Sequence, residues 1–203
     1  MSTDNNDPQL QLNKIIVFIL CLMPIYEVLW YSITGRFGDY PSWEIIGITG
    51  EAALIFLLIT LSVTPIRRKF GWNALLKYRR MFGLFAFFYA TAHFFVYIWQ
   101  EDNFIIHEFL LDTINLPYIT VGFLAWLLLI PLAVTANNKS IKRIGKNWKR
   151  IHSMIYVITF LSVLHYLLVR LWNPTDILGY AAILAALLGY RFFHARTAKD
   201  WTF

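Results

Sequence analysis

The chain alternates between long apolar stretches and short polar connections. A helix that crosses the hydrocarbon core of a bilayer needs about 20 predominantly apolar residues. Six stretches approach that length: 14–34, 44–64, 80–99, 117–135, 151–172 and 175–193. The pattern therefore predicts an all-α integral membrane protein, with six transmembrane helices in residues 14–194, a polar N-terminal segment at 1–13 and a cytoplasmic tail at 195–203.

Composition supports this class. Hydrophobic residues make up 58% of the 203 residues and charged residues only 15%, whereas about half of a typical soluble domain is apolar. The formal net charge of +6 would suggest nucleic-acid binding in a soluble protein. Here the basic residues lie in connections between apolar stretches, so we predict contact with the lipid bilayer and no nucleic-acid partner. The single cysteine, Cys21, leaves no partner for an intrachain disulfide or a cysteine-based metal cluster.

The distribution of charge predicts the orientation of the helices. Connections 65–80 and 136–150 are strongly basic, whereas residues 100–116 contain no lysine or arginine. The acidic residues of that stretch are Glu101, Asp102, Glu108 and Asp112. Cytoplasmic loops of membrane proteins carry an excess of lysine and arginine. Both basic connections and both termini are therefore predicted to be cytoplasmic, which gives an N-in/C-in topology.

Two parts of the chain resemble each other. A shift of 71 residues places 48–64 on 119–135 with identical residues at several positions, among them Thr49 on Thr120 and Thr64 on Thr135. A shift of 72 places His93 on His165. We interpret this as a parallel internal repeat of helices two and three in helices four and five, which would make helices three and five face each other. The alternative is that two leucine-rich helices match by chance.

His93 and His165 are the leading candidates for a functional site. An ionisable residue inside a span is costly unless it is paired or ligated. At 1.5 Å per residue, His93 lies about 20 Å from Arg80 and His165 about 22 Å from Arg150, so both reach a similar depth. Two imidazoles at one depth on facing helices can ligate a haem iron from both sides. The aromatic residues around His93 would suit a flat macrocycle: Phe87, Phe88, Phe94 and Phe95.

Two other kinds of protein would also carry histidines inside their spans. Each histidine could simply hydrogen-bond to a neighbouring helix. A transporter or metal permease would also carry intramembrane histidines and a repeat. These spans lack the further carboxylates at that depth that a zinc or iron transport site would normally need.

Three more residues near the cytoplasmic surface could bind a cofactor. His152 lies thirteen residues before His165, but Arg80 occupies the corresponding position before His93. His152 could therefore ligate a second haem with an unusual partner, line another cofactor's pocket or be solvated. Arg79 and Arg80 have the guanidinium geometry that matches phosphate, and the phosphate of flavin mononucleotide (FMN) is a plausible ligand. The alternative is that both arginines only anchor the topology.

Several segments together resemble the MsrQ family, formerly called YedZ, in the ferric-reductase-like transmembrane superfamily. They are Thr64-Pro65-Ile66-Arg67-Arg68, Tyr78-Arg79-Arg80-Met81-Phe82-Gly83-Leu84 leading to His93 and Tyr97, Leu116-Pro117-Tyr118-Ile119-Thr120-Val121-Gly122, and Trp148-x-x-x-His152 leading to His165-Tyr166. The resemblance covers essentially all of the chain from the first helix onward.

This resemblance implies an inner-membrane electron-transfer subunit that binds haem b and FMN. Its expected partner is a periplasmic molybdopterin methionine sulfoxide reductase, MsrP, which repairs oxidised periplasmic proteins. Its expected electron donor is the quinone pool or a flavin reductase. His93 and His165 match the family's haem positions, His152 its third histidine, and Arg79-Arg80 the pair associated with flavin. The broader superfamily's four-histidine pattern is incomplete, because Arg80 stands in place of one ligand.

Overall fold

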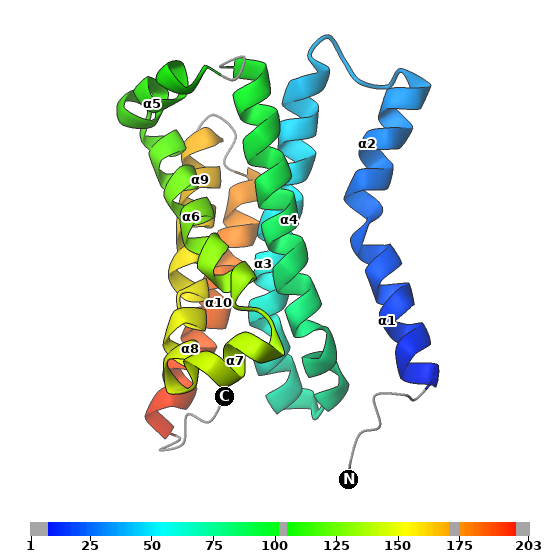
Figure 1. Cartoon of the computed structure of the whole chain (residues 1–203), viewed down its shortest axis with the longest axis vertical. Helices are drawn as coiled ribbons and strands as arrows, with labels where there is room; N and C mark the ends of the chain where they lie inside the picture. The colour runs from blue at the N-terminus through cyan, green and yellow to red at the C-terminus, as the bar shows by residue number, and fades with distance from the viewer. Residues whose placement is uncertain (1–7, 102–104, 171–174, 198–203) are drawn as a thin grey trace.

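The computed structural model describes residues 8–101, 105–170 and 175–197, and all elements in these ranges are helical (Figure 1). The parts of the predictions that concern Asp102, the end of the span 151–172, residues 1–7 or residues 198–203 lie outside the described residues. The elements are α1 (Pro8–Cys21), α2 (Met23–Thr34), α3 (Pro41–Phe70), the short 3-10 helix η1 (Asn73–Leu75), α4 (Leu76–Glu101), α5 (Ile106–Asn115), α6 (Pro117–Val134), α7 (Asn138–Ile144), α8 (Lys146–His152), α9 (Ile155–Val169) and α10 (Thr175–Thr197).

The centre of the molecule is a helix bundle made of two pairs. Helix α3 packs along α4, and α6 packs along α9, while α10 contacts both α3 and α9. The core contains Leu57 of α3, Ala86 of α4 and Ile158 of α9, which are at most 1% exposed. Helices α1 and α2 stand at the side of the bundle (Figure 1), where α1 contacts α4 and α2 contacts α3.

Four helical segments are long and apolar enough to cross a bilayer: 41–70, 73–100, 117–134 and 146–169. The pair α1 and α2 would form a fifth span if it crosses as one bent unit. The sixth predicted span corresponds to α10, whose apolar part within the described residues, Leu178–His194, is shorter. The chain is thus a multi-pass helical membrane protein, and the count of six spans stays a prediction.

The first predicted span is broken rather than continuous. Helix α1 ends at Cys21, α2 begins at Met23, and their axes differ by 44°. Pro24 lies at the start of α2. Proline has no N–H to donate and its ring clashes with the carbonyl four residues earlier, which explains a break at this position. Helix α1 also begins at Pro8, so part of the segment predicted as a polar tail is helical.

The bend is tied to the bundle by one buried hydrogen bond. The hydroxyl of Tyr89, a residue that is 1% exposed, donates to the carbonyl of Cys21 at 2.7 Å. We expect Tyr89→Phe to lower the free energy of unfolding by about 0.5–1.5 kcal/mol, because it leaves this carbonyl without its donor. Thermal unfolding followed by circular dichroism measures the change. Ser32→Ala is the control, because its hydroxyl bonds only within its own helix at an exposed position. Equal stability of Tyr89→Phe and the control would contradict the expectation.

The polar connections contain more helix than the sequence pattern predicts. Helix α3 continues through Pro65 to Phe70, because neighbouring groups in membrane helices can compensate for the hydrogen bond that a proline removes. Residues predicted as loops form α5, α7 and α8. Figure 1 places α7, α8 and η1 at one end of the bundle, where α1 begins and α10 ends, and places α5 at the opposite end. The two basic connections therefore share one end of the molecule.

Candidate functional site

The side chains of His93 on α4 and His165 on α9 meet inside the bundle. Their ring centres are 6.0 Å apart and their planes are nearly perpendicular, at 81°. A ring nitrogen lies about 1 Å from the centre of its imidazole and binds a metal at about 2 Å, so two imidazoles on opposite sides of one metal have centres about 6 Å apart. The observed separation fits ligation of one metal ion by both rings.

Hydrogen bonds to backbone carbonyls orient both rings. The Nδ1 atom of His93 lies 2.9 Å from the carbonyl oxygen of Ile46 on α3. The Nδ1 atom of His165 lies 2.7 Å from the carbonyl oxygen of Tyr118 on α6. A carbonyl oxygen can only accept, so Nδ1 carries the proton in both rings, and in the neutral imidazole Nε2 keeps a free lone pair. A hydrogen bond of this kind is what orients histidines that ligate metals.

Each imidazole ring also contacts a glycine, which lies on the same helix as the carbonyl that accepts the ring's hydrogen bond. A Cβ atom built on Gly50 would lie 2.8 Å from Nδ1 of His93. A Cβ atom built on Gly122 would lie 2.7 Å from Nδ1 of His165. Contacts this short are excluded by van der Waals radii, so any other residue at either position would displace the histidine. Both histidines are only half-buried, which means that part of each side chain is not covered by protein.

The two histidine contacts have the same spacing along the chain. The histidines, the carbonyls that they bond to and the glycines that they touch are each 72 residues apart: His93 and His165, Ile46 and Tyr118, Gly50 and Gly122. The sequence comparison aligned helices two and four with a shift of 71, which conceals the matching glycines. Applying the histidine shift of 72 to the whole repeat would have identified Gly50 and Gly122 as members of the site.

The predicted aromatic shell around His93 is only partly present. Phe88 and Phe95 are 48% and 53% exposed, so this part of the expectation is wrong. Helix geometry explains it, since these residues lie about 140° and 160° around α4 from His93. Phe87 packs against the bundle core. Phe94 stacks on Trp126 of α6 with ring centres 4.2 Å apart.

His152 is bound to its neighbours at the basic end of the bundle. Its Nε2 lies 3.0 Å from the hydroxyl of Thr135, and its ring stacks on Trp148 with centres 3.9 Å apart. The indole of Trp148 donates to the backbone carbonyl of Thr135 at 3.0 Å. The Thr135 hydroxyl is 2.6 Å from the carbonyl of Pro131, to which it donates, so it accepts from Nε2. Ligation of a metal by Nε2 of His152 would require this bond to break.

His152 lies within electrostatic range of both Arg79 and Arg80, while the two arginines line different hollows. Arg79 lines a cavity of about 100 Å³, and Arg80 lines a separate groove of about 460 Å³ between α1 and α4. Arg80 also donates to the side-chain oxygen of Asn138 at 2.9 Å. Adjacent residues on a helix point about 100° apart, which separates the two guanidinium groups. The assignment of these three residues to FMN stays a prediction.

A metal site with more than two protein ligands finds no support. Within the described ranges, no group of three or more His, Cys, Asp or Glu side chains could hold a metal ion. The pair of histidines instead suits a metal whose other ligands come with it, as the four nitrogens of a porphyrin do. The donor set, the ring separation and the fixed tautomers all fit a haem between His93 and His165.

Comparison with known proteins gives one consistent family. The family of the ferric reductase like transmembrane component matches residues 46–163, a range that includes His93 and His152 and ends two residues before His165. The protein-methionine-sulfoxide reductase heme-binding subunit MsrQ of Herminiimonas arsenicoxydans is 44% identical over 167 residues, which are 82% of this chain and 77% of that protein. The subunit with the same name in Xanthomonas oryzae pv. oryzae (strain MAFF 311018) is 40% identical over 192 residues, 92% of this chain and 88% of that protein. No solved structure matches the chain.

Proposed function

The chain belongs to the MsrQ family of ferric-reductase-like membrane proteins. We propose that it is the haem-binding subunit of a methionine sulfoxide reductase system and that it passes electrons across the bacterial inner membrane. The observation that carries the proposal is the pair of imidazoles whose centres are 6.0 Å apart and whose Nδ1 atoms donate to the carbonyls of Ile46 and Tyr118. A haem b held there would supply a one-electron carrier within the membrane.

The residues around this pair contribute the geometry of the proposed haem site and an apolar environment. Ile46 and Tyr118 hold the rings so that both Nε2 atoms are available as ligands. Gly50 and Gly122 allow the close approach that this orientation requires. Leu57 and Ile158, seven residues from Gly50 and His165 along their helices, belong to the packed apolar core, and apolar surroundings lower the local dielectric, which influences the redox potential of a haem.

The offset of 72 residues supports a parallel repeat with a pseudo-two-fold axis between the two histidines. In this proposal, each repeat unit contributes one carbonyl, one glycine and one histidine. The same axis would place both rings at one depth, nearer the end that carries α5. Under the proposed N-in/C-in topology that end is periplasmic, because the basic connections lie at the opposite end.

The proposed electron acceptor is a periplasmic molybdopterin subunit, MsrP, which reduces methionine sulfoxide in oxidised proteins. Its docking site would include α5, where Glu108 is exposed and the carboxylate of Asp112 accepts from Tyr97 at 3.1 Å. The proposed electron donor is the quinone pool or a cytosolic flavin reductase. FMN, if bound, would lie near Arg79, Arg80 and His152 at the basic end and would supply a further electron carrier between the donor and the haem. This chain has no proposed sulfoxide chemistry of its own.

The test is optical. Protein purified from haem-replete cells is expected to be red and to show a sharp α band on reduction with dithionite. Addition of the catalytic subunit together with methionine sulfoxide is expected to re-oxidise the haem, while the catalytic subunit without the sulfoxide is not. A colourless preparation, or a haem that stays reduced in the complete mixture, would reject the proposal.

A further inference from the structure

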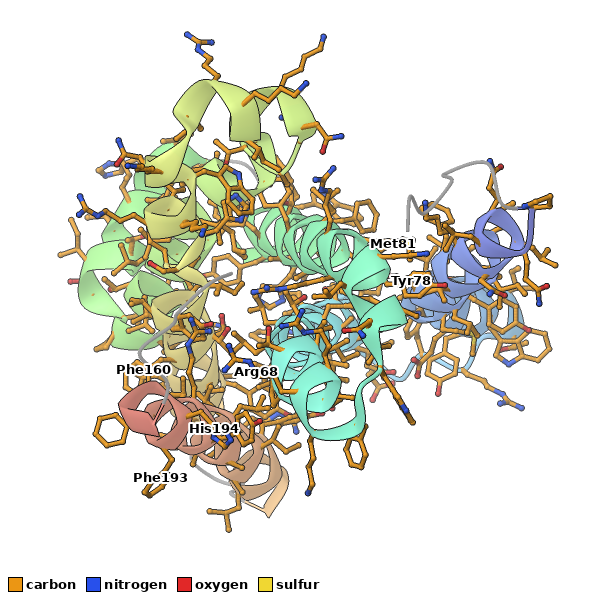
Figure 2. All side chains as sticks on the ribbon, turned by 90° about the horizontal axis from the view of Figure 1, so that it is seen from below. Arg68, Tyr78, Met81, Phe160, Phe193 and His194 are labelled. Carbon is orange, nitrogen blue, oxygen red and sulfur yellow. The ribbon has the colours of Figure 1, made fainter. Side chains whose placement is uncertain are left out.

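The groove between α1 and α4 is formed by one face of each helix. Lys14 and Phe18 of α1 and Leu22, which follows α1, are spaced by four residues and line one wall. Residues with this spacing lie on the same face of a helix. Figure 2 views the molecule from the basic end and shows Tyr78 and Met81 on the side of α4 that faces α1. Both residues line the other wall of the groove.

The side chains inside this groove are mostly apolar. Phe85 of α4 is 7% exposed, and its ring packs against that of Phe18 with centres 5.2 Å apart. Phe18, Leu84 and Phe88 also line the groove, and 40–49% of each side chain is exposed. The volume of about 460 Å³ lies within the roughly 300–1,000 Å³ of sites that hold small-molecule ligands. An apolar chain lying in the groove would therefore cover these three side chains.

Three cations line the same groove. Lys77 and Arg80 lie in the first two turns of α4, and Lys14 lies on α1. Figure 1 shows that both helices begin at the basic end of the bundle. Lys14 is half-buried and is followed by seven apolar residues of α1, where a cation is costly unless it is paired. None of the described residues that line the groove is an aspartate or glutamate, so its charge complements an anion.

Membrane topology and the helix dipole do not explain this arrangement by themselves. The positive-inside rule accounts for cations in cytoplasmic connections, but it does not require cations of two helices to lie along one apolar groove. Lys77 and Arg80 are the second and fifth residues of α4, near the positive end of its dipole, which disfavours cations and favours an anion. The tail of a quinone would suit the apolar part, but its neutral head group would not use the three charges.

We propose that this groove binds one anionic phospholipid of the leaflet at the basic end. The lipid phosphate would lie against Lys14, Lys77 and Arg80. One acyl chain would lie along the apolar part of the groove, between Phe18 and Phe88. Basic pockets between transmembrane helices bind the head groups of such lipids. The bound lipid would join α1 to the bundle, and the proposal depends on neither the haem nor the proposed redox function.

The first test compares two pairs of lysines in the purified full-length protein in detergent. Lys14→Gln/Lys77→Gln removes two cations from the groove. Lys142→Gln/Lys146→Gln removes two exposed cations from α7 and α8 at the same end and is the matched control. Native mass spectrometry measures the binding of phosphatidylglycerol and of phosphatidylcholine. We expect the unmodified protein to prefer phosphatidylglycerol by about tenfold or more, and the groove variant to bind it about 25-fold more weakly, since each cation contributes about fivefold.

The second test fills the groove and leaves its charges in place. Leu84→Trp adds a large side chain to the groove wall. Leu127→Trp is the matched control, because Leu127 of α6 is 41% exposed, compared with 40% for Leu84, and is not among the described residues that line the groove. We expect Leu84→Trp to weaken phosphatidylglycerol binding about tenfold, and the control to bind like the unmodified protein. Far-UV circular dichroism shows whether each variant is folded.

Four results would overturn the proposal. Equal losses in the two lysine double variants would show a general effect of surface charge. Unchanged binding in Leu84→Trp would show that the lipid lies elsewhere. Equal binding of the two lipids to the unmodified protein would exclude a role for the charges, and displacement of phosphatidylglycerol by decylubiquinone would assign the groove to a quinone. If Leu84→Trp does not fold, the comparison of the lysine variants decides the outcome by itself.

Discussion

Replacing His93 or His165 with alanine is expected to lower haem per polypeptide by about tenfold or more. Each substitution removes one of the two imidazoles whose ring centres lie 6.0 Å apart, and no other histidine in the described residues approaches this pair. Loss of the group that hydrogen-bonds to a metal ligand typically lowers metal affinity 10–100-fold. Loss of the ligand itself is expected to lower haem affinity by at least that much. The pyridine haemochrome assay on purified protein gives the haem content, and the α band of the reduced protein reports the ligation.

The control for this prediction is His107→Ala. His107 lies exposed in α5, so its replacement should leave haem content unchanged. His93→Gly should regain haem when free imidazole is supplied, because the ligand then enters the space that the side chain occupied. If both His93→Ala and His165→Ala keep the haem content of the unmodified protein, the redox role proposed for this pair is wrong.

Substitution of a single glycine is expected to have nearly as large an effect. In Gly50→Ala the new methyl carbon would lie 2.8 Å from Nδ1 of His93, which forces the ring away and breaks its hydrogen bond to the Ile46 carbonyl. We expect haem affinity to fall about 10–100-fold, the range seen when the orienting partner of a ligand is lost. Gly122→Ala should act equally on His165. Haem titration of the apoprotein measures the affinity.

Gly47→Ala is a matched control for this effect. Gly47 lies one turn before Gly50 in the same helix, and a Cβ atom there has no neighbour within 4 Å. Both substitutions replace glycine by alanine in a helix and so change helix propensity equally. Only the contact with the histidine differs between them. Equal haem affinity of Gly50→Ala and Gly47→Ala would show that the close approach does not matter for binding.

The sequence predicts the class of the protein and the pairing of its candidate ligands well. A long apolar stretch that crosses a bilayer forms a helix, because only a helix pairs all of its own backbone N–H and C=O groups, and unpaired groups are costly there. The similar depths of His93 and His165 follow from the helix rise alone. Both inferences need only local periodicity and distance along one helix, which are properties that a sequence contains.

Other features of the site could have been predicted but were missed. Adjacent residues on a helix point in different directions, so Arg79 and Arg80 could have been assigned to different surfaces from helix geometry alone. The same geometry places Phe88 and Phe95 away from His93. Gly50 and Gly122 share the offset of the two histidines, and a comparison at that offset would have found them.

What the sequence by itself determined is therefore the helical membrane class, the basic and acidic ends, and the two histidines at one depth, since each depends on neighbours along a single segment. Only the tertiary structure decided which carbonyl holds each ring, which glycine each ring touches, and that Lys14 joins Lys77 and Arg80 along one groove. Lys14 lies more than 60 residues from the other two in the sequence. The physical reason is that these contacts form between helices, and their geometry is set by how the helices pack rather than by the pattern within any one of them.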